Sequence, residues 1–286
     1  PSDIDSDENH IYSELGFYYT QQGQAELLER SVLTNNGKRM TGDSLFYDRN
    51  RGIGEAFQNV EFVDTISKNM LTGDYCFYNQ LTGYAFATDK AVATDFSQGD
   101  SLFIHADTLQ LYTFHVNTDS VYREARAYHK VRFYRTDIQG VCDSLVFSSK
   151  DSCLTLYQDP ILWNGKQQLL GEEIMVYMND STIDWAHIQN QALSVEQLDS
   201  LNYNQVSGKD MKAYFEGGEM KQVDVDGSVR LVYFPMEKDS TLLGMNCSET
   251  SKLSMFLENR KLMKLAMSPK SNGTLYPMTQ IPPAKM

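Results

Sequence analysis

A short segment recurs seven times along the 286-residue chain, and this repetition limits the available folds more than any other feature. Each copy begins with a small residue, usually followed by an acid, and continues with alternating apolar positions. The copies are TGDSLFYD, TGDYCFYN, HADTLQLY, VCDSLVFS, LGEEIMVY, SGKDMKAY and ETSKLSMF, anchored at Gly42, Gly73, Ala106, Cys142, Gly171, Gly208 and Thr250. Their spacing of 29 to 42 residues marks an architecture of stacked supersecondary units.

Two positions of each copy form apolar columns. Three places after the anchor stand Leu45, Cys76, Leu109, Leu145, Ile174, Met211 and Leu253. Two places further stand Tyr47, Tyr78, Leu111, Phe147, Val176, Ala213 and Met255. Residues two apart share one face of a strand, so these columns predict an apolar stripe that continues from strand to strand. The position between them is mixed, so the opposite face is only partly covered or faces water.

A second recurring element follows each anchor strand. It is represented by Val60, Val92, Val131, Ile161, Leu193, Val229 and Leu275, often with an apolar residue two places on, such as Phe62 or Phe133. Turn signals separate the two elements, so each unit is predicted as strand, turn, strand and often a third short strand. A capping box makes 194–200 a candidate helix, but the repeat assigns this segment to a second strand.

The acid that follows most anchors has two interpretations. A short acid beside a small residue is turn chemistry at the entry of a strand. A ladder of catalytic carboxylates would need two acids to converge on one substrate bond, whereas a repeated column spreads them along the molecule. The sequence therefore favours turns and predicts no catalytic residue.

The net charge of −13, with a pI near 4.8, argues against a protein that reads nucleic-acid phosphates. One segment of the chain departs from this acidic balance by placing five cations within thirteen residues. They are Arg123, Arg126, Lys130, Arg132 and Arg135. They form either a solvated strand face or a patch that contacts an anionic headgroup or another subunit.

The four cysteines show no C-x-x-C spacing and no histidine or cysteine partner at zinc-ligand distances. No metal site and no cofactor is therefore expected. A turn is predicted between Cys142 and Cys153, but the register it implies does not place them opposite each other. Buried free thiols are favoured over a disulfide.

The pairing of G-D-x-L-x-Y at 42–47 with N-V-x-F at 59–62 resembles the OstA family of periplasmic lipopolysaccharide-transport proteins, which includes LptA-like bridge proteins. The resemblance runs through nearly the whole chain, although the chain is longer than a typical bridge protein and several copies lack the Asp or the Gly. It implies a repetitive antiparallel β-jelly-roll of about seven to eight units: two facing sheets folded like a taco around an apolar groove. In that family the groove carries the acyl chains of lipid A.

On this interpretation the two apolar columns supply the lipid groove, with ordinary core packing as the alternative for each residue. The candidates are Leu45, Tyr47, Cys76, Tyr78, Leu109, Leu111, Leu145, Phe147, Ile174, Val176, Met211, Ala213, Val60, Phe62, Val131 and Phe133. Lipopolysaccharide or lipid A is the expected ligand. Unpaired edge strands are expected to add other bridge components, or a second copy head to tail, by β-augmentation.

The chain is expected to divide into a disordered lead at 1–10, an OstA-like repeat domain at 11–268, in one piece or as two tandem halves, and a tail at 269–286. The tail contains four prolines and is either a cap, a linker or the start of a further region. No apolar run is long enough for a membrane helix. A periplasmic location with the signal peptide removed is expected, with membrane association through partners or missing segments.

Two other function classes remain open from the sequence. One is a structural or adhesive β-solenoid that binds proteins at its edges and has an interior filled with side chains. The other is a right-handed parallel β-helix enzyme acting on polysaccharide, although the five histidines fall in different repeat columns and form no recurring site. The shape of the interior distinguishes the lipid carrier from the solenoid.

Overall fold

The computed structural model describes residues 2–5, 9–35, 37–66, 68–97, 99–116, 118–136, 138–179, 182–237, 239, 241–259 and 261–282. These residues form an all-β fold in which every described strand pair is antiparallel. The predicted fold class, a repetitive antiparallel stack of β-strands, is confirmed. The chain divides into two compact units, Pro1–Asp151 and Ser152–Met286, called unit 1 and unit 2.

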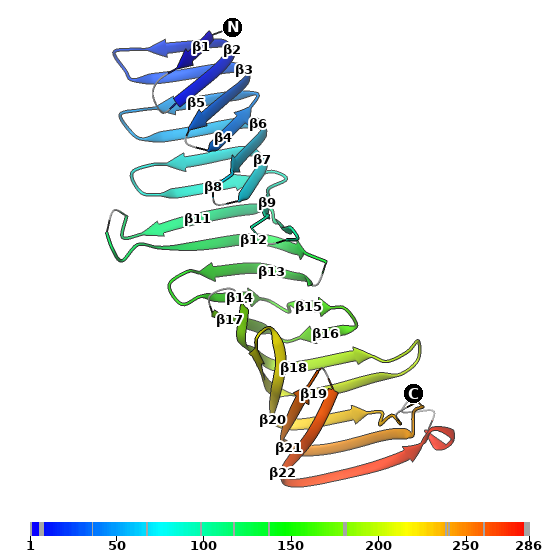
Figure 1. The fold of residues 1–286 in the computed structure, drawn as a ribbon. Helices are drawn as coiled ribbons and strands as arrows, with labels where there is room; N and C mark the ends of the chain where they lie inside the picture. The colour runs from blue at the N-terminus through cyan, green and yellow to red at the C-terminus, as the bar shows by residue number, and fades with distance from the viewer. Residues whose placement is uncertain are drawn as a thin grey trace. The chain divides into compact units, whose positions relative to one another are not determined.

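Unit 1 contains the first thirteen strands, which run from blue to green in Figure 1. They are β1 (Ser2–Asp5), β2 (Asn9–Tyr19), β3 (Gln24–Asn35), β4 (Lys38–Gly42), β5 (Ser44–Asp48), β6 (Ile53–Asp64), β7 (Asn69–Asn79), β8 (Tyr84–Thr88), β9 (Val92–Asp95), β10 (Leu102–His105), β11 (Thr108–Phe114), β12 (Tyr122–Tyr134) and β13 (Gln139–Ser148).

Unit 2 contains the remaining strands and one short 3₁₀ helix. They are β14 (Cys153–Tyr157), β15 (Ile161–Asn164), β16 (Gln167–Leu170), β17 (Glu173–Asn179), β18 (Thr182–Gln197), β19 (Tyr203–Glu216), β20 (Glu219–Tyr233), β21 (Gly244–Glu258), β22 (Lys261–Pro277) and η1 (Met278–Gln280). The candidate helix at 194–200 is strand β18 as far as Gln197, as the repeat predicts.

The long strands of unit 1 belong to two layers, because each pairs with different neighbours on either side of a bend. One half of β6 pairs with β5 and the other half pairs with β4. In the same way β7 pairs with β8 and then β9, and β12 pairs with β11 and then β10. We call the layer that contains β5, β8 and β11 layer A, and the layer that contains β4, β9 and β10 layer B.

The bends are built from β-bulges that coincide with the repeat anchors. Opposite Gly73 the register of β6 shifts between Phe57 and Val60, and the two inserted residues, Gln58 and Asn59, have φ of 55° and 51°. Equivalent shifts occur opposite Cys142, Gly208 and the residue after Thr250. Because a bulge bends and twists the strand that carries it, a recurring bulge turns the stack into two layers.

The acids that follow the anchors hold these bends together. The Asp43 carboxylate accepts a hydrogen bond from Asn59 Nδ2 at 2.8 Å. Asp74 accepts one from Lys90 Nζ at 2.6 Å, and Glu172 accepts one from Gln191 Nε2 at 2.7 Å. The donors are residues of the inserted pairs, so the acid column has the turn role that the sequence favours.

The two layers of unit 1 pack together near the bend. One core cluster joins Leu27, Leu45 and Cys76 of layer A with Val60 of layer B, and half-buried Met40 packs against it. In unit 2 a fully buried row crosses the strands at the same distance from the bend. It consists of Leu156, Ile174, Ile188, Met211, Val225 and Leu253.

The second recurring element is misaligned by one residue in three copies. Val60, Val131 and Val229 are buried as expected. In three other copies the buried residue is the one before the aligned position: Ala91 instead of Val92, Pro160 instead of Ile161, and Ala192 instead of Leu193. Leu275, in the seventh copy, is exposed. The buried position holds a small or cyclic residue, alanine or proline, in the three slipped copies, so an alignment on large apolar residues places it one residue late, and a slip of one residue moves a side chain to the opposite face of a strand.

Strands also lie within the predicted lead and tail. Strand β1 pairs with the start of β2 inside segment 1–10, where 1 and 6–8 lie outside the described residues. Strand β22 continues past the predicted boundary at 268 to Pro277 and pairs with β21. Pro269 lies in this strand beside a register shift, and no other strand pairs with β22 in the part of the chain that is described. Proline is compatible with such an edge position because it lacks an N–H to donate.

Candidate functional site

The inner face of layer A in unit 1 carries two rows of side chains that the strand register places side by side. The row nearer the bend, called the corner row, consists of Gly16, Leu27, Leu45, Ala56, Cys76, Ala87, Leu109, Ala127 and Leu145. The next row outward, called the rim row, consists of Tyr18, Ala25, Tyr47, Gly54, Tyr78, Ala85, Leu111, Ala125 and Phe147.

The corner row is closed. Leu45 and Cys76 are 6% exposed, and their cross-strand neighbours Ala56 and Ala87 are completely buried. Burial raises the pKa of the Cys76 thiol to about 11, so this side chain is neutral and behaves as a small apolar group at pH 7. These predicted groove residues are therefore core residues that fix the bend.

The rim row is open. Tyr47 is 39% exposed, Tyr78 is 45% exposed and Leu111 is 36% exposed, although all three belong to the inward-facing column. A Cβ atom added to Gly54, between Tyr47 and Tyr78, would meet no atom within 4 Å. The inner face of unit 1 is thus packed near the bend and accessible two residues further out, which is the shape of a groove.

Large and small residues alternate along the rim row. Tyr47 is followed by Gly54, then Tyr78 by Ala85, and Leu111 by Ala125. Each small residue leaves a furrow between two large side chains. The furrows have apolar walls, and a tyrosine ring adds a hydroxyl that can remain in water.

The equivalent positions in unit 2 are filled. Val176 is 9% exposed and Ala213 is 2% exposed, and their cross-strand neighbours Ala186 and Val223 are also buried. Ile174 and Met211, nearer the bend, are completely or almost completely buried. In unit 2 the predicted groove residues are core residues.

Layer B contributes the remaining groove candidates. Val60 and Val131 are buried at the bend, and Phe133 is 8% exposed. Phe62 is half-buried and lies between Met40 and Leu71 on neighbouring strands. These side chains form the opposite wall of unit 1 close to the bend.

The structure does not bring the five predicted cations together. Arg126 lies on the outer face of layer A with its Nε on the Glu124 carboxylate, and Lys130 lies in the bend, 3.2 Å from Asp107. Arg132 is exposed in layer B, where Arg135 follows at the strand end. Alternate residues point to opposite faces and a bend divides the segment, so closeness in sequence does not produce a patch. Of the five cations, only Arg123 lies in layer A on the same face as the rim row, two residues from Ala125 on β12.

The outer face of layer A carries an unbroken row of aromatic rings that the repeat columns do not reveal. Neighbouring ring centroids along it lie 4.7 to 6.3 Å apart. The rings are those of Phe57, Tyr75, Phe86, Phe77, Tyr84, Tyr112, Phe114 and Tyr122. Burial, together with a hydrogen bond to Glu55, raises the pKa of Tyr75 to about 12. Such cross-strand aromatic pairs stabilise the sheet.

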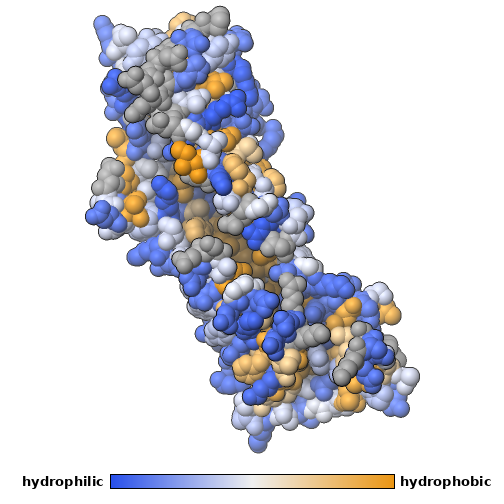
Figure 2. All heavy atoms as spheres, in the orientation of Figure 1, coloured by the Kyte–Doolittle hydropathy of each residue, from blue (hydrophilic) through white to orange (hydrophobic). Residues whose placement is uncertain are grey.

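Apolar residues (orange) are visible between hydrophilic residues (blue) on the surface of unit 1 in Figure 2.

Among the described residues, no group of three or more His, Cys, Asp or Glu side chains has an arrangement that suits a metal ion. The described part of the chain also has no helix long and apolar enough to cross a membrane.

The family model described as OstA-like protein matches residues 4–97, about a third of the chain. This segment is similar to that family. The OstA-like match includes the repeat copies anchored at Gly42 and Gly73, and with them Tyr47, Gly54 and Tyr78 of the open rim row. No curated protein matches the chain significantly.

Proposed function

We propose that unit 1 is a non-enzymatic carrier or bridge element in lipopolysaccharide transport, which holds lipid A acyl chains against the rim row of layer A. The OstA-like match at 4–97 supports this proposal. The observation that carries it is the open inner face at Gly54, where an added Cβ would meet no atom within 4 Å and the neighbouring Tyr47 and Tyr78 are exposed.

The character of the rim row suits a ligand that slides. Its side chains offer apolar, non-directional contacts, so contacts that an acyl chain loses behind are replaced by equivalent contacts ahead. The row crosses eight strands from β3 to β13 with the same alternation of large and small residues. A site for one fixed ligand would instead need a few precisely placed polar groups.

The proposed setting is the periplasm, with the signal peptide removed and membrane association through partners. Other bridge components, or a second copy of the chain, would add to an edge strand such as β22 by β-augmentation. Transport then needs no chemical step by this chain, and direction comes from its partners.

Site-specific photocrosslinking tests the proposal on two neighbouring residues of β7. A photoreactive phenylalanine derivative at Tyr78 lies in the open rim row, whereas the same group at Phe77 lies on the outer face against Phe86. We expect an adduct with lipopolysaccharide from position 78 and little from position 77. Equal yields, or no adduct from position 78, would contradict the proposal.

Unit 2 fits the structural alternative better, because its equivalent row is filled. In that row Val176, Ala186, Ala213 and Val223 are buried, and Leu265 on the edge strand β22 is 37% exposed. We propose that unit 2 presents its edge strand, β22, to protein partners. Photoreactive groups along the exposed length of β22, which includes Leu275 at 57% exposure, would then crosslink to protein and not to lipid.

A further inference from the structure

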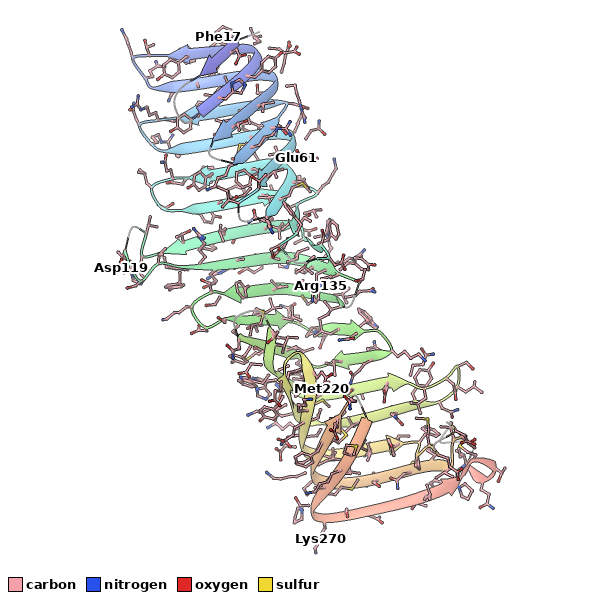
Figure 3. All side chains as sticks on the ribbon, viewed as in Figure 1. Phe17, Glu61, Asp119, Arg135, Met220 and Lys270 are labelled. Atoms are coloured by element: carbon pink, nitrogen blue, oxygen red, sulfur yellow. The ribbon has the colours of Figure 1, made fainter. Side chains whose placement is uncertain are left out.

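Two open hollows adjoin at the end of layer A in unit 1, beside the turn between β11 and β12. The first has a volume of about 390 Å³ and includes Leu111, Ala125 and Phe147 of the rim row together with Arg123. The second has a volume of about 460 Å³ and includes Lys150. The hollows share Val121, Tyr122 and Ser149, and His115 and Ser120 complete the lining of the second. Asp119, labelled in Figure 3, marks the tip of the turn and lines neither hollow.

The charge of these hollows is opposite to that of the chain. Their described lining contains Arg123 and Lys150 but no carboxylate, although the chain has 38 acidic and 25 basic residues. Neither cation forms an ion pair with a described carboxylate, whereas neighbouring Arg126 is bound to Glu124. The Lys150 ammonium lies 5.6 Å from the centre of the Tyr122 ring, which belongs to the aromatic row on the outer face, so Arg123 is the cation on the side of the rim row.

The backbone holds the cationic end of the groove in place. The main-chain N–H of Arg123 donates to Ser149 Oγ at 2.8 Å, and the Ser149 N–H donates to the Arg123 carbonyl at 2.9 Å. Arg123 is therefore the next inward residue after Ala125 on β12, directly beyond the apolar rim row. Apolar floor and cation adjoin on one continuous surface.

We propose that this end of the groove binds the anionic headgroup of a lipid, with Arg123 at the headgroup and the acyl chain over Leu111, Ala125 and Phe147. The inference rests on the proposed function, because it assumes that the rim row binds an acyl chain. A guanidinium makes charge-assisted hydrogen bonds to phosphate oxygens, which are stronger than bonds between neutral groups. The groove would then recognise an amphiphile by both of its parts.

Calorimetric titration of the full chain with three probes below their micellar concentrations tests the inference. Dodecyl phosphate has chain and charge, dodecyl maltoside has the same chain without charge, and inorganic phosphate has charge alone. For Arg123→Gln we expect about tenfold weaker binding of dodecyl phosphate. Binding of dodecyl maltoside should not change. Arg132→Gln, an exposed cation in layer B, is the matched control and should change neither.

The outcomes separate the inference from the proposed function. If both amphiphiles bind and Arg123→Gln weakens neither or both equally, the headgroup site is refuted while the groove stands. If neither amphiphile binds to the wild-type chain, the proposed function fails and the inference fails with it. If inorganic phosphate alone binds as tightly as dodecyl phosphate, the site is for free phosphate and the inference is overturned. Matching unfolding curves show that the variants are folded, as expected for exposed side chains.

Discussion

Adding one methyl group at Gly54 or at Gly73 is predicted to change the free energy of unfolding in opposite directions. Both glycines belong to unit 1, and they lie on the neighbouring strands β6 and β7. A Cβ at Gly54 would meet no atom within 4 Å, whereas a Cβ at Gly73 would lie 3.0 Å from the Thr88 carbonyl oxygen. The comparison therefore measures the difference between the open rim row and the closed bend.

The expected magnitudes follow from these two environments. Glycine inside a strand costs about 0.5–1 kcal/mol relative to alanine, so Gly54→Ala should stabilise the chain by about that amount. At Gly73 the same gain is opposed by overpacking against the backbone, which typically costs about 1–3 kcal/mol. Gly73→Ala should therefore destabilise the chain by roughly 1 kcal/mol.

Urea unfolding followed by far-ultraviolet circular dichroism measures both changes, with an unchanged slope as the check that the transition is comparable. The reasoning would be refuted if Gly54→Ala destabilised the chain by as much as Gly73→Ala. That result would mean that side chains fill the space above Gly54, and the groove in unit 1 would be a closed core.

Two further predictions concern ionisable groups in unit 1. The pKa of Asp48 is lowered by a hydrogen bond from Gln24 and then by the main-chain N–H of Arg51, so its stabilising contribution is present above its ordinary pKa and is lost as the pH falls through the lowered value. Below about pH 4 the melting temperature should fall more steeply for the wild type than for Asp48→Ala, and parallel curves in calorimetry would contradict this. Because burial raises the pKa of Cys76 to about 11, maleimide should label half-buried Cys153 and Cys247 before Cys76 at pH 8. Equal labelling rates by peptide mass spectrometry would show that the inner face near the bend is open.

The repeat allowed much of the fold to be predicted because it records the constraints that recur. A small anchor, usually followed by an acid, recurs at the bulges, and an apolar residue recurs three places on in every copy. Leu45, Cys76, Leu145 and Met211 are buried at that position. The second element was predicted less well, because the buried position after the bulge holds a small residue in some copies, and Ala192, not Leu193, faces inward.

The open groove could not be predicted from the same columns. The small partners of the rim row, such as Gly54 and Ala85, lie on strands outside the seven anchor segments, and only the hairpin pairing with Tyr47 and Tyr78 reveals them. Nor does residue size decide exposure: Ala213 is 2% exposed in unit 2, whereas Leu111 at the same column position is 36% exposed in unit 1. The exposure of a side chain on the inner face depends on which side chains of the opposite layer pack against it. The sequence of one strand does not contain that information.

Filling the open face of unit 1 tests the lipid-groove proposal most directly. Gly54→Trp places a large side chain where no protein atom lies within 4 Å of the added Cβ, and Gly99→Trp, in the loop between β9 and β10, is a control with the same open surroundings. The measurement is the equilibrium binding of lipopolysaccharide to the wild type and to both variants. We predict at least about tenfold weaker binding for Gly54→Trp, wild-type binding for Gly99→Trp, and folded protein in both cases. Wild-type affinity in a folded Gly54→Trp variant would contradict the proposal that acyl chains lie along the rim row.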